Sequence, residues 1–348
     1  MPLNPEVKVV SMKIRNLGLL GLAAAAVVSL VACSSDAPSG GSSAAGADGP
    51  IKIRVQSQAS IAAEPLYLGV EQGFFEEEGL DVEIVDLPDL SSAIAALQAG
   101  KLELAFTPTI GALQMARQNV PVTLIAPSDG INPVAAEAPL EEQRNYTSVG
   151  VYTSAASGID NIEGLAGASI AVPELKAQAD ATITSVLQEA DVETDEIEWL
   201  NLGFVPALEA LKNDQVDAAF LVSPYSIEAD AAGLKRIMNP SAVFFPQGSA
   251  TSAWAASQSW AQENPEAVAR FQRAIAKSAE WANENLEATQ QHAIDRSGLK
   301  LTPEQMPQSY WPHAIDQAQL EEVDDKLVAI GFFDDAIDVS TILTPVAK

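Results

Sequence analysis

Residues 51–85 read IKIRVQSQASIAAEPLYLGVEQGFFEEEGLDVEIV. Apolar and polar residues alternate over residues 51–55 and again over residues 80–85, which is typical of half-buried strands. Residues 64–75 between them place apolar side chains at helical spacing. A strand, a helix and a second strand in this order form a β-α-β unit. We therefore predict an α/β fold that begins at Ile51.

A helix followed by a buried strand occurs twice, 114 residues apart. Ser91 and Ser92 can cap a helix that runs to Gln98. Gly100 can end this helix, and residues 102–106 are apolar enough for a strand. The positions that recur are Ile94, Ala96, Leu97, Glu103, Ala105 and Phe106, which match Leu208, Ala210, Leu211, Asp217, Ala219 and Phe220. Chance similarity in an alanine-rich chain is one explanation, but the pattern favours two lobes built on the same βαβ plan.

Turn-forming segments predict where the chain passes between these lobes. We place the first crossing near residues 162–167, a glycine-rich stretch before a strand at residues 169–172. The return is placed near residues 246–248. The predicted domains are therefore lobe I, residues 51–165 and 249–348, and lobe II, residues 166–248. Two connections form a natural hinge, about which lobes can close on a ligand.

The first 32 residues have the pattern of an export signal. Lys13 and Arg15 form a basic start, and residues 17–31 are an apolar run too short to span a bilayer comfortably. The run ends in Leu30-Val31-Ala32-Cys33, which resembles the bacterial lipobox, where the cysteine is lipidated before cleavage. We predict a signal peptide over residues 1–32 and an extracytoplasmic protein anchored to the cell membrane by lipid on Cys33.

Cys33 is the only cysteine of the chain, so the body cannot contain disulfides. A plain secretory peptide with Cys33 as a bystander is the alternative. Residues 34–50 consist almost wholly of small and polar residues that cannot bury enough apolar surface to fold. Residues 33–50 are therefore expected to be the lipidated cysteine and a flexible tether.

The body is strongly acidic. Residues 1–32 hold three of the 19 basic and one of the 47 acidic residues, which leaves 16 and 46 and a net charge of −30. Nucleic acid and anionic lipid are bound through clustered Lys and Arg, so neither is an expected partner. We expect membrane contact through the lipid anchor alone.

The residues that most enzyme sites require are missing from the sequence. The two histidines, His292 and His313, lie 21 positions apart in a helical tail, and the body has no cysteine after Cys33. Neither a Cys/His nucleophile nor a zinc site can be assembled from this set. No glycine-rich phosphate loop or nucleophile elbow is present. We expect no enzyme activity, no metal and no cofactor.

Small polar loops follow several of the predicted strands in both lobes. In open α/β sheets, ligands bind outside the carboxyl ends of the strands. Hydroxyls and amides of these loops, with nearby carboxylates and rings, could surround a small molecule. The candidate ligand-binding residues are Gln58, Ser60, Glu64, Tyr67, Thr107, Thr109, Ser128, Asp129, Ser154, Ser157, Lys176, Gln178, Phe204, Ser223 and Tyr225.

Motifs spread over nearly the whole body resemble those of one protein family. They are PLYLG at 65–69, GFF at 73–75, EGLDV at 78–82, ALQAG at 96–100, DAA at 217–219, SPY at 223–225 and ENPE at 263–266. In this order and spacing they resemble the solute-binding lipoproteins of bacterial ABC transporters for sulfonates, nitrate, taurine and thiamine pyrimidine precursors. Glu103 departs from the aspartate that the family usually has there.

The resemblance implies a type II periplasmic-binding-protein fold, with two lobes that close on a small-molecule ligand. It also implies an ABC permease and ATPase as partners, and we expect a monomer. The ligand stays open between a small anion, for which only Lys176 is an obvious cation, and a heteroaromatic such as a pyrimidine. Two other functions are weighed: a ligand sensor that reports to a membrane receptor, and a pyrimidine-precursor synthase. The synthase branch depends on a cysteine-rich motif and a reactive histidine.

Overall fold

The computed structural model of the chain describes residues 49–57, 60–87 and 90–346. The predicted signal peptide, Cys33 and the tether as far as residue 48 lie outside the described residues. Within the described part, none of the helices combines the length and apolar character that a membrane span needs.

Ten strands form two five-stranded sheets among the described residues, and both sheets have the same topology. The first contains β1 (Ile51–Gln56), β2 (Leu80–Val85), β3 (Leu104–Pro108), β4 (Val122–Gly130) and β10 (Ala250–Ser257), in the order β2-β1-β3-β10-β4. The second contains β5 (Val149–Thr153), β6 (Ser169–Val172), β7 (Glu198–Asn201), β8 (Ala218–Val222) and β9 (Lys235–Met238), in the order β7-β6-β8-β5-β9. In the first sheet β2, β1 and β3 pair in parallel, and β10 pairs antiparallel to β3 and β4. In the second sheet β7, β6 and β8 pair in parallel, and β5 pairs antiparallel to β8 and β9.

The chain passes from the first sheet to the second earlier than the sequence predicted. We placed the crossing near residues 162–167, but β5 already pairs with β8 from Val149 onward, so the crossing lies between β4 and β5. The glycine-rich stretch instead forms η3 (Ile162–Leu165), a turn within the second half. A turn signal marks a reversal of the chain without indicating which sheet the next strand joins. The return to the first sheet lies between β9 and β10.

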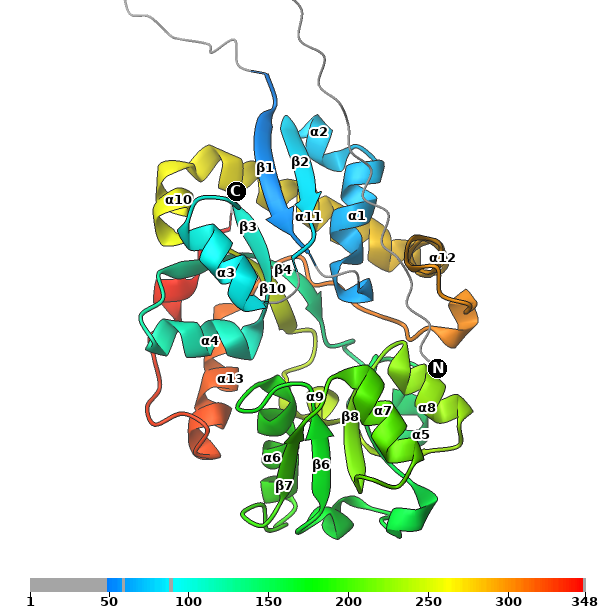
Figure 1. The fold of residues 1–348 in the computed structure, drawn as a ribbon. Helices are drawn as coiled ribbons and strands as arrows, with labels where there is room; N and C mark the ends of the chain where they lie inside the picture. The colour runs from blue at the N-terminus through cyan, green and yellow to red at the C-terminus, as the bar shows by residue number, and fades with distance from the viewer. Residues whose placement is uncertain (1–48, 58–59, 88–89, 347–348) are drawn as a thin grey trace, which may run out of the picture. The chain divides into compact units, whose positions relative to one another are not determined.

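Helices cover both sheets (Figure 1). Those associated with the first sheet are α1 (Glu64–Glu71), α2 (Phe74–Glu77), α3 (Leu90–Gln98), α4 (Thr109–Arg117), α10 (Gln258–Glu263), α11 (Pro265–Glu284), α12 (Leu286–Ser297) and α13 (Gln317–Ala329). Those of the second are α5 (Leu140–Gln143), α6 (Gln178–Glu189), α7 (Phe204–Lys212), α8 (Tyr225–Ala231) and α9 (Pro240–Phe244). Short 3₁₀ helices are η1 (Ile61–Ala63), η2 (Ala155–Ser157), η3, η4 (Pro303–Gln305) and η5 (Val339–Ile342).

Alternate residues of the central strands enter different cores, so both faces of each sheet are buried. In the first sheet, Phe106 and Trp254 pack with α1 and α11, whereas Ala253 packs with α4 and α13. In the second sheet, Phe220 packs with α6, while Ala219 packs with α7. All of these core residues belong to the described part of the chain, which therefore contains its own hydrophobic cores.

The helix predicted over residues 64–75 is two helices. Gly73 adopts a left-handed conformation with φ of 80°, which interrupts the helix after α1 and starts α2 at Phe74. Phe75 then packs against Phe271 of α11, with ring centroids 5.4 Å apart. The break turns Phe75 of the GFF motif into the core, while Phe74 stays half-buried beneath the Lys277 ammonium.

Candidate functional site

A cavity of about 1070 Å³ is lined by residues from both sheets. We call it the main cavity. Many lining residues come directly after strands: Pro108 ends β3, Asp129 lies at the end of β4, Pro173 follows β6 and Ser223 follows β8. Thr251 and Ser252 lie at the start of β10, which runs antiparallel and so begins at this same edge. The cavity thus occupies the position where open α/β sheets bind ligands.

The structure brings five of the predicted site residues to the main cavity: Ser60, Asp129, Gln178, Phe204 and Ser223. Gln58 lies outside the described residues. Several lining residues were not predicted from the sequence, among them Phe106, Tyr146, Phe220, Ser241, Thr251, Ser252 and Tyr310. The start of β10 carried a usable signal, because an antiparallel strand that follows a turn begins at the ligand-binding edge. Tyr310 carried none, since a backbone bridge to Gly130 positions it from far along the chain.

Other predicted residues have roles inside the protein and are not among the lining residues. The Thr109 hydroxyl donates to the carbonyl of Ala250 at 2.9 Å, and the Ser128 hydroxyl donates to the carbonyl of Ala62 at 3.0 Å. Thr107 is fully buried within β3. Ser128 and Thr107 sit one position before lining residues, and neighbouring side chains of a strand point to opposite faces. Thr107 and Ser128 thus lie at strand ends next to the cavity, but their side chains are not on the face of the strand that lines it.

Four further predicted residues also lie outside the lining. The Ser154 hydroxyl accepts the backbone N–H of Ser157 at 3.3 Å, and the Ser157 hydroxyl donates to the carbonyl of Ser154 at 2.7 Å. These contacts close the turn of η2. Lys176 is exposed, and its backbone N–H donates to the carboxylate of Asp180 at 2.6 Å. Tyr225 stacks on Phe204, with ring centroids 5.8 Å apart and planes at 21°. Tyr225 therefore packs against Phe204, which lines the cavity, without lining the cavity itself.

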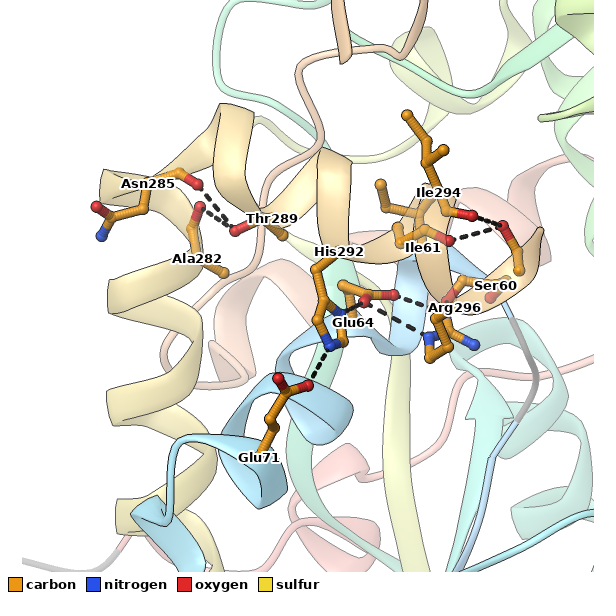
Figure 2. A network of polar contacts seen from close by, with 12 residues as sticks. Ser60, Ile61, Glu64, Glu71, Ala282, Asn285, Thr289, His292, Ile294 and Arg296 are labelled. Atoms are coloured by element: carbon orange, nitrogen blue, oxygen red, sulfur yellow. Dashed lines mark hydrogen bonds and ion pairs between the residues drawn. The ribbon is translucent and has the colours of Figure 1, made fainter. Parts of the chain in front are cut away.

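Glu64 belongs to a polar network that ties α1 to α12 (Figure 2). Tyr67 of α1 contacts Arg296 of the same network. The buried Glu64 carboxylate accepts from Arg296 at 2.6 Å and contacts His292, whose Nε2 lies 2.6 Å from Glu71. The Arg296 guanidinium also lies 3.9 Å over the Tyr67 ring and donates to the carbonyl of Ser60 at 3.3 Å. The network thus fixes the backbone of a residue that lines the cavity.

The surroundings of His292 favour its protonated, positively charged form. Burial lowers the pKa of its imidazole, but hydrogen bonds and the charges of Glu64 and Glu71 raise the pKa more, so the net pKa lies above the usual 6.5. A protonated His292 places a second positive charge beside the buried carboxylate of Glu64. From the sequence, Glu64 was predicted to contact the ligand; in the structure its carboxylate pairs with His292.

Asp129 is the most strongly constrained ionisable group of the cavity. Its Oδ1 accepts a hydrogen bond from the Thr251 hydroxyl at 3.0 Å and another from the Ser252 hydroxyl. Burial raises the pKa of the Asp129 carboxyl, while these hydroxyl donors lower it less. The charged residues among the described lining are Asp129 and Glu174, and none of that lining is Lys, Arg or His.

Three buried polar atoms of the lining have no hydrogen-bond partner among the described residues: Ser60 Oγ, Gln178 Oε1 and Ser241 Oγ. Buried polar groups are nearly always paired, so such atoms indicate positions that a ligand or water satisfies. The described residues contain no cluster of three or more His, Cys, Asp or Glu side chains placed to hold a metal ion. The arrangement is suited to holding a small molecule by hydrogen bonds and ring contacts.

Comparison with known proteins agrees with this geometry. The sequence model of the family described as "NMT1/THI5 like" matches residues 61–136 and 142–288, more than half of the chain. The aliphatic sulphonate binding protein SsuA of Escherichia coli has 14% identity and a TM-score of 0.66, over 84% of this chain and 97% of that one. The nitrate-binding protein NrtA of Synechocystis PCC 6803 has 13% identity and a TM-score of 0.65, over 84% and 86%. The chain therefore has the fold of periplasmic binding proteins.

A curated enzyme also matches over a short stretch. It is the 4-amino-5-hydroxymethyl-2-methylpyrimidine phosphate synthase of Aspergillus parasiticus, 38% identical over 61 residues. The match spans 18% of this chain and 18% of the length of that relative.

Proposed function

Because this chain belongs to the NMT1/THI5-like family, we propose that it is the solute-binding component of an ABC importer. It captures one small molecule in the main cavity and delivers it to a permease and ATPase in the membrane. The observation that carries the proposal is the cavity itself, about 1070 Å³ at the ligand-binding edge of both sheets, with buried polar atoms that lack partners. Ligand pockets are typically about 300–1,000 Å³ in volume.

Capture would use the two chain connections between the sheets as a hinge. The segments β4 to β5 and β9 to β10 join the halves that supply the two sides of the lining. A ligand that contacts both sides favours the conformation in which they approach each other, by the difference of its affinity for the two states. We propose that this conformation is the one that docks on the permease.

We further propose that the protein is an extracytoplasmic monomer, held to the cell membrane by lipid on Cys33. A tether of about 17 residues has a typical end-to-end distance of roughly 20–25 Å, which suits docking on a permease in the same membrane. The acyl chains each contribute about 0.8 kcal/mol per buried CH₂ to membrane attachment.

A synthase activity is the alternative that the short match to the Aspergillus enzyme raises. The described lining of the main cavity contains neither His nor Cys, whereas it contains many hydroxyls, amides and rings. Such a set offers hydrogen bonds and ring contacts, but neither the imidazole nor the thiol on which the synthase branch depends. This composition supports binding over synthesis.

A thermal-shift screen tests the proposed function. The chain from Ser34 onward keeps every described residue and its cores, and it is screened with sulfonates, nitrate, taurine, pyrimidines and aromatic amines. A ligand at about 100 times its Kd stabilises the folded state by about 2.7 kcal/mol, so one class should raise the melting temperature by several degrees. If no class raises it, or if all raise it equally, solute capture by this cavity is refuted.

Uptake by living cells separates an importer from a sensor. Deletion of the gene should abolish high-affinity uptake of the compound found in the screen, and the intact gene should restore it. Cells that keep their uptake but lose a transcriptional response to the compound would point to a receptor partner in place of a permease.

A further inference from the structure

The charge of the main cavity differs in sign from what a small anion needs. Asp129 and Glu174 are the charged side chains of the described lining. An anion such as a sulfonate or nitrate that leaves water must be compensated by donors, and cationic side chains provide the strongest of these. Two carboxylates and no described cation oppose such a ligand.

The Asp129 carboxylate is placed to bind a donor from the ligand. Thr251 and Ser252 hold Oδ1 from one side. No other described residue donates a hydrogen bond to Oδ2. Burial raises the pKa of this carboxyl, and the described lining has no cation to compensate its charge. A ligand N–H group, and a protonated one above all, would supply that compensation.

The N-terminus of α6, which would otherwise attract an anion, is already occupied by a carboxylate. Ala177 and Gln178 of this end line the cavity. Asp180 accepts the backbone N–H of Lys176 at 2.6 Å and that of Ala177 at 2.8 Å. Both N–H groups lie at or just before the cap of α6, so the Asp180 carboxylate places a negative charge at the helix end that would otherwise favour an anion. At α4, the cap Pro108 makes no side-chain hydrogen bond, so acceptor atoms of a ligand can still find N–H groups there.

Aromatic side chains also contribute to the lining. Phe204 is held by its stack on Tyr225, and Phe106 is held edge-on to Trp254, with centroids 6.0 Å apart. Tyr146 and Phe220 also line the cavity. Fixed rings favour a planar ligand, and their faces attract cations.

We propose that the main cavity selects a planar cationic ligand, such as an amidinium, and that Asp129 binds its N–H donors. The inference rests on the proposed function and names its ligand class. It separates this chain from the sulphonate-binding and nitrate-binding proteins that share its fold. Asp129 is then the residue that determines specificity.

Three compounds of one shape and different charge test the inference: benzamidinium, benzamide and benzoate. Calorimetric titration of the chain from Ser34 should give the highest affinity for benzamidinium, at least about tenfold above benzoate, with benzamide between them. Asp129→Asn should weaken benzamidinium binding about tenfold or more and remove the discrimination. Asp195→Asn, an exposed site that loses the same charge, should change affinity less than about twofold.

Benzoate binding as tightly as benzamidinium, or unchanged discrimination in Asp129→Asn, would overturn the inference. The charge series on the unmodified protein remains decisive if the Asn variant does not fold. When nitrate or a sulfonate binds and benzamidinium does not, solute capture stands and the inference falls. When no compound of either set binds, the proposed function falls together with the inference.

Discussion

The carboxylate of Asp217, which precedes β8, accepts the backbone N–H of Ser169, at the start of β6, at 2.8 Å. The backbone N–H of Asp217 donates in turn to the carbonyl of Ser169 at 3.1 Å. Glu103 makes the same pair of contacts with Arg54, at 2.7 and 3.1 Å. An acidic residue ahead of a strand therefore ties that strand to its parallel neighbour in both sheets. The 114-residue repeat has its physical basis in these contacts.

Asp217→Ala should lower the free energy of unfolding by roughly 1–3 kcal/mol. The substitution removes an acceptor from the Ser169 N–H and from the Ser169 hydroxyl, which lies 2.7 Å away, and leaves partly buried donors without partners. Urea denaturation followed by circular dichroism measures the change. Glu196→Ala, at an exposed site just before β7, is the control and should stay within about 0.5 kcal/mol of the unmodified protein. Equal stability of both variants would remove the structural role of Asp217.

The repeat also shows why much of the fold could be predicted. Glu103 and Asp217 recur at equal offsets from apolar residues because each must meet a neighbouring strand at a fixed register. A local pattern can reveal such a constraint. The crossing before Val149 could not be predicted in this way, since it depends on β5 pairing with β8, a strand about 70 residues further along the chain.

The site was predictable only in part, for a similar reason. Asp129, Gln178 and Phe204 lie next to strand ends, where the sequence indicates ligand contacts. Which of two neighbouring residues faces the cavity depends on strand register: Asp129 lines the cavity, whereas Ser128, which was predicted with it, is not among the lining residues. Glu64 was also predicted to contact the ligand, but it binds Arg296 and His292. These partners lie more than 200 residues further along the chain, so a local sequence pattern cannot reveal them.

Phe204→Ala should weaken ligand binding about tenfold, or about 1.4 kcal/mol. The ring lines the cavity, and its loss removes a stacking surface from the ligand. Titration calorimetry with the compound found in the screen measures the effect. Tyr225→Ala should weaken binding less, because that ring acts through Phe204, and Tyr225→Phe should have no effect because it keeps the stack. Unchanged affinity in Phe204→Ala would exclude this ring from the site.

His292 should make stability depend on pH. Its folded-state pKa lies above the unfolded value of 6.5, so its contribution is complete below about pH 6.5 and is lost as the pH rises through the folded-state pKa. The stability difference between the unmodified protein and His292→Gln should therefore shrink from about pH 5.5 to about pH 8.5 in urea denaturation. A difference that is constant with pH would contradict the role given to Glu64 and Glu71.

Cys33→Ser should release the protein from the membrane without changing its affinity for the ligand. The prediction follows from the lipobox-like sequence, since a serine cannot carry the thioether-linked lipid, and the cavity is built from residues beyond the tether. Fractionation of cells with immunodetection measures the release, and the Ser34→Ala variant is a control that should stay in the membrane fraction. Retention of the Cys33→Ser protein would refute the anchor.

The most direct test of the account fills the main cavity from one side. A Cβ added at Gly111, which lines the cavity, would lie 3.9 Å from Leu90 and 4.0 Å from Pro108, so a side chain can start there in ordinary van der Waals contact. Calorimetric titration of the unmodified protein should show one bound molecule per chain. Gly111→Phe should show no binding heat while it keeps its melting temperature, and Ala231→Phe, at an exposed site on α8, should bind normally. Binding by Gly111→Phe at unchanged affinity would contradict the claim that this cavity holds the solute.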